Sequence, residues 1–220
     1  MDLSTLLASA IHDMKNQLHL LAPDLAYLGG SPDPAVNRAA GNIKQKLDGI
    51  DLGLVRLLML YRLSVESGTG VLNVREIYVA DLLNELPEVA DAGFDGQHGD
   101  KESVPVVEVR CAPDLAGYFD ENLVAAVLRD ALDNARRFAR SKIVITATGE
   151  FNGTQIVIED DGPGPEFTVE NTGGDESRTG LGMHLAESVA RAHSSKDRVG
   201  YARLETSSNL GGGAFTLFLP

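Results

Sequence analysis

The sequence contains a single cysteine, Cys111, and lacks the long apolar run that a membrane span needs. One cysteine excludes an internal disulfide and fits a reducing compartment. No apolar stretch approaches the roughly 18 residues of a spanning helix, so no membrane insertion is expected. The N-terminus also lacks a basic segment leading into an apolar one, and we therefore predict no signal peptide. Together these absences predict a cytoplasmic protein.

Basic residues are scarce as well. Lys and Arg number 19 against 32 Asp and Glu, which gives a formal net charge of −13. Neutralising nucleic-acid phosphates needs clustered cations, so no nucleic-acid partner is expected. A single nucleotide needs only a local cradle and is not excluded. The 43% hydrophobic content is enough for a folded core, and 220 residues allow one large domain or two small ones.

Apolar residues recur at helical spacing through residues 3–28 and again through residues 35–66. The intervening "GGSPDP", residues 29–34, predicts a break, so the two helices should form an antiparallel hairpin. Each apolar stripe is too long for one hairpin to bury alone. Pairing two hairpins into a four-helix bundle would bury both stripes, and we therefore predict a homodimer.

A mixed pattern begins after "SGTG", residues 67–70, which marks a domain boundary between 1–66 and 71–220. We predict strands at 71–74, 104–110, 143–148 and 154–159, helices at 79–92, 121–139 and 182–193, and two closing strands. Hairpin-like strands with helices between them predict an α+β sandwich, in which a mixed sheet carries helices on one face.

Three polar motifs interrupt this C-terminal pattern. "EDDGPG", residues 159–164, can hold a carboxylate at a pocket mouth while its glycines admit a ligand, although an ordinary acidic turn explains it equally well. Asp130 and Asn134 lie one helical turn apart and offer oxygen ligands to Mg²⁺, or else form a solvated pair. "TGLGM", residues 179–183, leads into a helix whose first N–H groups can bind phosphate. Each motif alone is a weak indication.

His12 is the unusual residue of the first helix. At about 100° per residue it lies roughly 140° around the helix from the apolar stripe, so it faces solvent in any bundle built on that stripe. Asp13 adjoins it, and Asn16 follows one turn later on nearly the same face. A lone exposed histidine usually has no task, so the rest of the chain decides its interpretation.

Taken in order, these motifs resemble those of sensor histidine kinases. "HDMKNQL" resembles their H box, "DALDNARRF" the N box, "DDGPG" and "TGLGM" the two glycine boxes, and "GGGAFTLFLP" the last strand. The resemblance implies a dimerisation and histidine-phosphotransfer domain at 1–66. It implies an ATP-binding catalytic domain of the GHKL ATPase type at 71–220.

The resemblance also implies a role for each matching residue. His12 would accept the phosphoryl group, Asp13 would hold its imidazole and take its proton, and Asn16 would orient water to dephosphorylate a partner. Asp160 would bind the adenine amino group. Asn134 would bind Mg²⁺, with Asp130 beside it. Arg137 and Phe138 would lie near the nucleotide, and Gly162 and Gly164 would line the adenine. Gly180 and Gly182 would allow the lid to close over the phosphates.

The expected activity is that of a cytoplasmic two-component histidine kinase. It would autophosphorylate His12 from ATP and pass the phosphoryl group to an aspartate of a response regulator receiver domain, with phosphatase activity on that regulator as a second expected role. A separate sensor or input protein would supply the signal. The alternatives are a histidine phosphotransferase with a degenerate ATP-binding domain, and a nucleotide-binding regulator without catalysis.

Departures from the family pattern bear on that choice. Arg178 replaces a glycine of the second glycine box, and the preceding segment from residue 165 is short and lacks the F box, which favours the phosphotransferase. The intact Asn134, Asp160 and Gly162 favour the kinase. Gln17 stands where many H boxes have proline, so any helix bend should move toward Pro23.

Overall fold

The computed structural model describes residues 10–11, 13–14, 16–65, 72–93, 104–150, 153–165, 181–195 and 197–220. The chain divides into two compact units, Met1–Gly70 and Val71–Pro220, and each is described by itself. Across the described residues, no helix is both long enough and apolar enough to cross a membrane.

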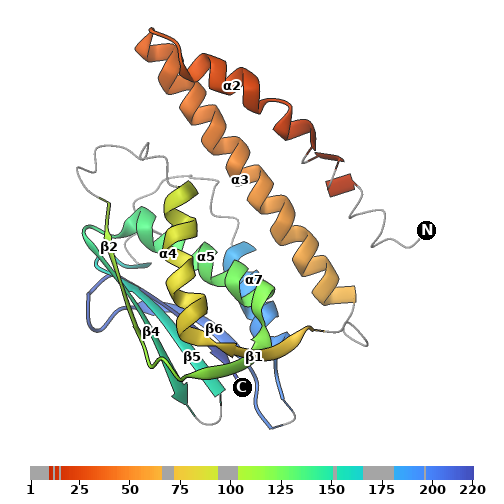
Figure 1. The fold of residues 1–220 in the computed structure, drawn as a ribbon, viewed down its shortest axis with the longest axis vertical. Coiled ribbons are helices and arrows are strands. Elements are labelled where there is room, and N and C mark those ends of the chain that lie inside the picture. The colour runs from red at the N-terminus through yellow and green to blue at the C-terminus, as the bar shows by residue number, and fades with distance from the viewer. Residues whose placement is uncertain are drawn as a thin grey trace. The chain divides into compact units, whose positions relative to one another are not determined.

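In the N-terminal unit the helices α2 (Ala22–Gly29) and α3 (Pro34–Val65) run side by side (Figure 1). The described residues before α2 are also helical, up to a turn at Leu20 and Leu21. There the Leu21 N–H donates to the Leu18 carbonyl, 3.0 Å away, and Pro23 stands in the first turn of α2. Proline suits that position because its missing N–H would have no helical partner. The predicted continuous helix over 3–28 is therefore wrong, and the predicted shift of the bend toward Pro23 is confirmed.

Side chains close the predicted break between α2 and α3. Oδ1 of Asp33 accepts from the Ala35 N–H at 2.8 Å and so satisfies the exposed start of α3. Nδ2 of Asn37 donates to the Gly29 carbonyl at 2.7 Å, at the end of α2. The "GGSPDP" segment thus ends one helix and begins the next, as its composition predicts.

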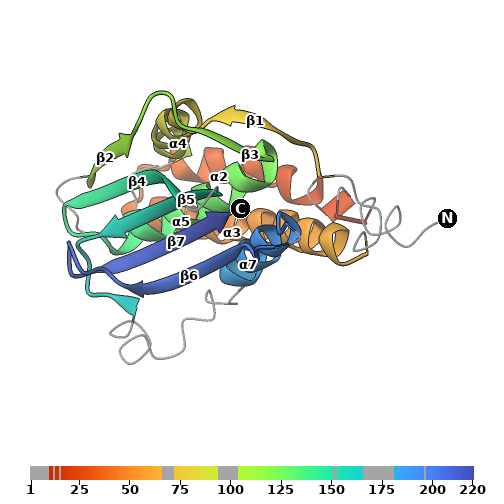
Figure 2. The same cartoon turned by 90° about the horizontal axis from the view of Figure 1, so that it is seen from below.

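The C-terminal unit is built on a five-stranded sheet with the order β2-β4-β5-β7-β6 (Figure 2). Its strands are β2 (Val106–Cys111), β4 (Lys142–Glu150), β5 (Gly153–Asp160), β6 (Tyr201–Thr206) and β7 (Gly213–Leu219). β2 runs parallel to β4, and every other neighbouring pair is antiparallel. The sheet is therefore mixed, as predicted.

Three helices cover one face of this sheet: α4 (Val79–Gly93), α5 (Glu121–Phe138) and α7 (Leu181–Ala192) (Figures 1 and 2). Alternate sheet residues point into the layer between sheet and helices. The largest fully buried apolar side chains are Leu83, Leu86, Phe119, Leu128, Leu132, Ile143, Ile145, Ile156, Ile158, Leu185 and Leu217. Each contributes on the order of 1.5–3 kcal/mol by leaving water, so this layer is the core of the unit.

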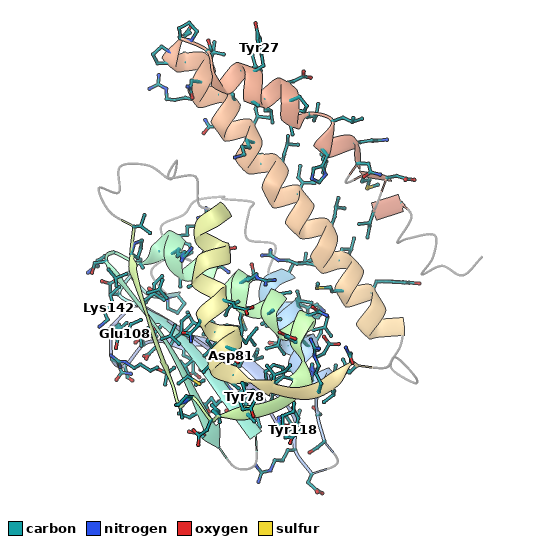
Figure 3. All side chains as sticks on the ribbon, viewed as in Figure 1. Tyr27, Tyr78, Asp81, Glu108, Tyr118 and Lys142 are labelled. Carbon is teal, nitrogen blue, oxygen red and sulfur yellow. The ribbon has the colours of Figure 1, made fainter. Side chains whose placement is uncertain are left out.

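A second, two-stranded antiparallel sheet joins β1 (Val74–Tyr78) to β3 (Ala116–Asp120). The strand predicted at 71–74 begins only at Val74, and β3 was not predicted. On this ribbon the Tyr118 hydroxyl donates to Glu76 Oε1 at 2.9 Å, between directly paired residues. Figure 3 shows Tyr78 and Tyr118 near each other on these two strands.

The outer edge of the main sheet carries charged side chains. Lys142 Nζ lies 2.8 Å from Glu108 Oε2, and Arg110 Nε lies 2.7 Å from Glu108 Oε1 (Figure 3). Hydrogen bonds from Arg110 and then Lys142 lower the pKa of Glu108 to about 2. Because the pairs are exposed to solvent, they contribute little to stability, but they keep charge on an edge strand.

Candidate functional site

Asp160 ends β5 on the helix-covered face of the sheet. The residue is only 7% exposed, and its Oδ1 accepts from the Gly162 N–H at 2.8 Å. A carboxylate is rarely buried without hydrogen bonds, because desolvation disfavours its charge. The short turn after β5 therefore both shields this carboxylate and holds it in one orientation.

Glycines from two separate segments surround Asp160. A β-carbon at Gly212 would collide with the Asp160 carbonyl, its Oδ1 and the Gly162 nitrogen, and one at Gly213 would lie 2.7 Å from Oδ2. A β-carbon at Gly162 would lie 2.5 Å from the Phe138 carbonyl. Gly212 and Gly162 meet backbone atoms that cannot move aside, whereas a β-carbon at Gly213 would displace the Asp160 carboxylate.

Gly164 completes this arrangement. Its φ of +85° is a conformation that residues with side chains rarely adopt, and the nearest atoms to its missing β-carbon belong to Gly211 and Gly212. The residues predicted for adenine binding, Asp160, Gly162 and Gly164, therefore lie together with a glycine turn that enters from between β6 and β7. That arrangement can accept a hydrogen-bond donor on a flat group that comes close to the backbone.

Asp161 fastens the same end of β5 to the loop between α5 and β4. Its Oδ1 accepts from the backbone N–H groups of Arg140, Ser141 and Lys142 at 2.7–3.2 Å, and its Oδ2 accepts from the Ser141 hydroxyl at 2.7 Å. Partial burial alone would raise the pKa of Asp161, but the hydrogen bonds from Ser141, Lys142 and Arg140 outweigh it and hold that pKa well below its usual range.

Asp130 and Gly182 meet where α5 packs on α7. Asp130 is 8% exposed, and a β-carbon at Gly182 would collide with its Oδ2, so the carboxylate lies against the first turn of α7. The first N–H groups of a helix have no acceptor within that helix and carry a partial positive charge, which favours a carboxylate. The alternative interpretation, that Asp130 and Asn134 form a solvated pair, does not hold for Asp130, because its carboxylate is buried.

The remaining candidates on α5 lie farther from its buried face. Asn134 and Arg137 are exposed, Phe138 is half-buried, and the Arg137 guanidinium lies 5.6 Å from the centre of the Phe138 ring. Gly180 falls outside the described residues, as do Arg178 and most of the predicted lid. Within the described ranges no group of three or more His, Cys, Asp or Glu side chains could hold a metal ion. The Mg²⁺ assignment to Asn134 and Asp130 stays a prediction.

His193 connects the end of α7 to the start of α5. Its Nε2 accepts from the Asp120 N–H at 2.9 Å, and its Nδ1 lies 2.7 Å from the Val189 carbonyl. Burial lowers the pKa of His193, against the opposing effects of the Val189 carbonyl and Asp120. The residue is 8% exposed and braces Asp120, whose side chain in turn caps α5 through the Leu123 N–H.

The catalytic candidates of the N-terminal unit are described only in part. His12 lies outside the described residues. Asp13 and Asn16 are in helical conformation and exposed, as is His19 one turn beyond Asn16. Their proposed roles in phosphoryl transfer therefore stay predictions.

The sequence motifs did not identify the residues that hold the turn next to Asp160. Glu159 is buried at 8% exposure and is hydrogen-bonded to Ser207 and Asn209, residues almost fifty positions away. The only available signal was the "GGG" at 211–213, which marked the last strand but did not indicate that its glycines touch Asp160.

Part of the sequence matches a known protein family. Residues 119–220 match the family model described as histidine kinase-, DNA gyrase B-, and HSP90-like ATPase. No protein of curated function matches the sequence as a whole. The matched segment begins at the last residues of β3 and contains every C-terminal site candidate.

Solved structures of histidine kinases share the fold. The chain is similar to the Acinetobacter baumannii histidine kinase AdeS, with a TM-score of 0.54 and 18% identity over 96% of this chain and 95% of that one. It is similar to the cytoplasmic segment of histidine kinase QseC, with a TM-score of 0.51 and 18% identity over 77% and 94% of the two chains. The catalytic domain of histidine kinase ThkA gives a TM-score of 0.50 at 18% identity, over 67% and 95%.

The mixed sheet under its helices is consistent with the GHKL ATPase fold, and the glycine-lined carboxylate lies inside the matched segment. The family match over residues 119–220 and the fold shared with these structures support a histidine kinase ATPase core in this region.

Proposed function

We propose that the protein is an ATP-dependent histidine kinase that phosphorylates His12 and passes the phosphoryl group to an aspartate of a response regulator. The observation that carries the proposal is the buried Asp160 carboxylate, held by Gly162 and approached closely by the glycine turn at 211–213. A base with an exocyclic amino group needs such an acceptor and such clearance. We place this reaction in the cytoplasm, as the single cysteine favours.

The residues at the C-terminal site fit a bound nucleotide. Asp160 would accept from the adenine amino group, with Gly162 and Gly164 forming the wall beside it. Asn134, with Asp130 nearby, would hold Mg²⁺, whose charge neutralises phosphate oxygens in phosphoryl transfer. The other proposed contacts are made by Arg137, Phe138, Gly180 and Gly182. Mg²⁺ would offset part of the negative charge of ATP beside the carboxylates of the site.

The N-terminal helices support a homodimer. Among the described residues, six of their eight exposed large apolar side chains fall on two seven-residue repeats, and the other two are Leu20 and Tyr27. The first repeat is Met14, Leu21 and Leu28, with Leu21 in the turn before α2, and the second is Ile43, Ile50 and Leu57 on α3, all between 39% and 51% exposed. Seven-residue spacing is that of helices packed along a common seam, and exposed apolar stripes of this length need a partner. We propose that a second copy of the hairpin covers them in a four-helix bundle.

An exposed position for the acceptor suits its proposed partners. Asp13 and Asn16 flank His12 and are exposed, so an ATP domain and later a receiver domain could reach the same face. A neutral imidazole with a pKa of about 6.5 is a competent nucleophile at neutral pH. Asp13 would hold it and take its proton, and Asn16 would orient water for dephosphorylating the regulator. A separate sensor protein would supply the input.

The test is incubation with γ-labelled ATP and Mg²⁺. Acid-labile label on the protein should disappear in His12→Gln and in Asp160→Asn and persist in His19→Gln, the matched control on the same helical segment. Label that persists in His12→Gln would refute the assignment of the acceptor. No label from ATP, together with acceptance from a phosphorylated receiver domain, would show a histidine phosphotransferase instead.

A further inference from the structure

Glu159 and Asp160 are consecutive residues of β5 and therefore point to opposite faces of the sheet. Asp160 faces the helices, and Glu159 faces the other side, in register with Val144 on β4 and Ala214 on β7. Both are buried, at 8% and 7% exposure. A buried carboxylate on the face away from the proposed nucleotide requires its own explanation.

Glu159 binds the turn between β6 and β7. Its Oε1 accepts from the Ser207 hydroxyl at 2.7 Å, and Nδ2 of Asn209 donates to both of its oxygens at 3.1 Å. The Ser207 oxygen also accepts from the N–H groups of Asn209 and Leu210. The Ser207 hydroxyl therefore donates its one proton to the carboxylate of Glu159.

The same turn contacts Asp160 at its other end. The Ser207 N–H donates to the Gly212 carbonyl at 2.7 Å, and the Gly212 N–H donates to the Asp160 carbonyl at 3.1 Å. Gly212 and Gly213 lie against the two carboxylate oxygens of Asp160, with no room for a β-carbon at either position. A continuous path of short contacts therefore runs from Glu159 through the turn to the carboxylate of Asp160.

We propose that Glu159 is a positioning residue for base recognition. It fixes the turn at 207–212, and the turn fixes the carboxylate of Asp160 where it accepts from the amino group of adenine. This inference rests on the proposed binding of ATP. It assigns to Ser207 and Asn209 a part in selecting adenine over a purine that has a carbonyl at the same ring position.

The test compares ADP with inosine diphosphate, whose base lacks the amino group, by calorimetric titration of the full 220-residue chain with Mg²⁺. The wild type should bind ADP more tightly. Glu159→Gln places an NH₂ group against the donors of Ser207 or Asn209 and breaks at least one charge-assisted bond. ADP should then bind about tenfold more weakly, the equivalent of about 1.4 kcal/mol, while inosine diphosphate binding stays unchanged.

Glu205→Gln is the matched control, because Glu205 is an exposed carboxylate on β6, paired with Ala214 on the same sheet face. It should keep the wild-type preference. Asn209→Ala changes an exposed residue and should shift the preference in the same direction by about threefold, so the test does not depend on Glu159→Gln folding.

Three results would overturn the inference. If Glu159→Gln and Asn209→Ala both bind ADP as tightly as the wild type, the turn does not position Asp160 for base recognition. Equal weakening of both nucleotides shows a general structural effect without base selection. A wild type that binds neither nucleotide refutes the proposed ATP site itself, and this outcome is separate from the first two because it does not involve the variants.

Discussion

Replacing Asp161 with asparagine should destabilise the C-terminal unit by about 2 kcal/mol at neutral pH. The carboxylate accepts from three consecutive backbone N–H groups, those of Arg140, Ser141 and Lys142, and from the Ser141 hydroxyl. Asparagine keeps one acceptor oxygen but places an NH₂ group against a donor. Hydrogen bonds to charged groups contribute about 1.5–3 kcal/mol, and the partial exposure of Asp161 favours the lower part of that range.

The same change should alter the response to acid. Despite partial burial, the bonds from Ser141, Lys142 and Arg140 keep the pKa of Asp161 well below its usual range. A group with a lowered pKa stabilises the fold fully above its unfolded pKa of about 3.9, and that contribution is lost as the pH falls toward the folded value. The difference between wild type and Asp161→Asn should therefore narrow below about pH 4.

Urea unfolding followed by circular dichroism measures both effects, at pH 7.5 and at steps from pH 5 to 3.5. Ser141→Ala removes only the hydroxyl donor and should cost about 1 kcal/mol. Asp114→Asn, in the exposed turn before β3, should leave the midpoint unchanged. If Asp161→Asn unfolds at the wild-type urea concentration at pH 7.5, or if the gap persists unchanged at pH 3.5, the hydrogen-bond account is refuted.

Three further results are expected. Burial lowers the pKa of His193, so wild-type stability should fall as the pH drops from 7.5 through about 6.5, and His193→Gln should show a smaller change in urea midpoint between pH 7.5 and 5.5. Gly212→Ala should lower the free energy of unfolding by about 1–3 kcal/mol and weaken ADP binding, because its β-carbon meets backbone atoms. Gly29→Ala, whose β-carbon would lie in open space, should leave stability unchanged or slightly raised. Thermal melts measure the stability of both variants, and titration with ADP measures their binding. Ile50→Glu should convert the proposed dimer to a monomer in light scattering, and Lys46→Glu on the same helix should not.

The periodic elements of the fold were predictable from sequence. Helices α3 and α5 and strands β4 and β5 carry clear apolar repeats, and the structure places them within a few residues of the predicted bounds. β3 was missed because "AGYFD" contains glycine and aspartate, which are poor strand formers. A β-carbon at Gly117 would lie 2.7 Å from Thr154 Oγ1, so the close packing of these two distant residues favours glycine at that position.

The candidate site was predictable only where a motif is local. Asp160, Gly162 and Gly164 belong to one short loop, so a sequence pattern can reveal them. Ser207 and His193 act through partners 48 and 73 positions away, and no local pattern specifies which residues a turn or a helix end will meet after folding. The burial of His193 follows from the packing of α7 on the start of α5, which only the assembled unit defines.

Three adjacent acids at the end of β5 each serve a different segment: Glu159 the turn after β6, Asp160 the glycine wall, and Asp161 the loop after α5. Glu159 and Asp160 point to opposite faces because each step along a strand reverses the side-chain direction, whereas Asp161 lies beyond the end of β5. Losing one residue from the β4–β5 hairpin would exchange the sheet faces of Glu159 and Asp160, whereas losing two would restore them. Length changes in this hairpin should therefore be tolerated in pairs, even where the loop itself has no role.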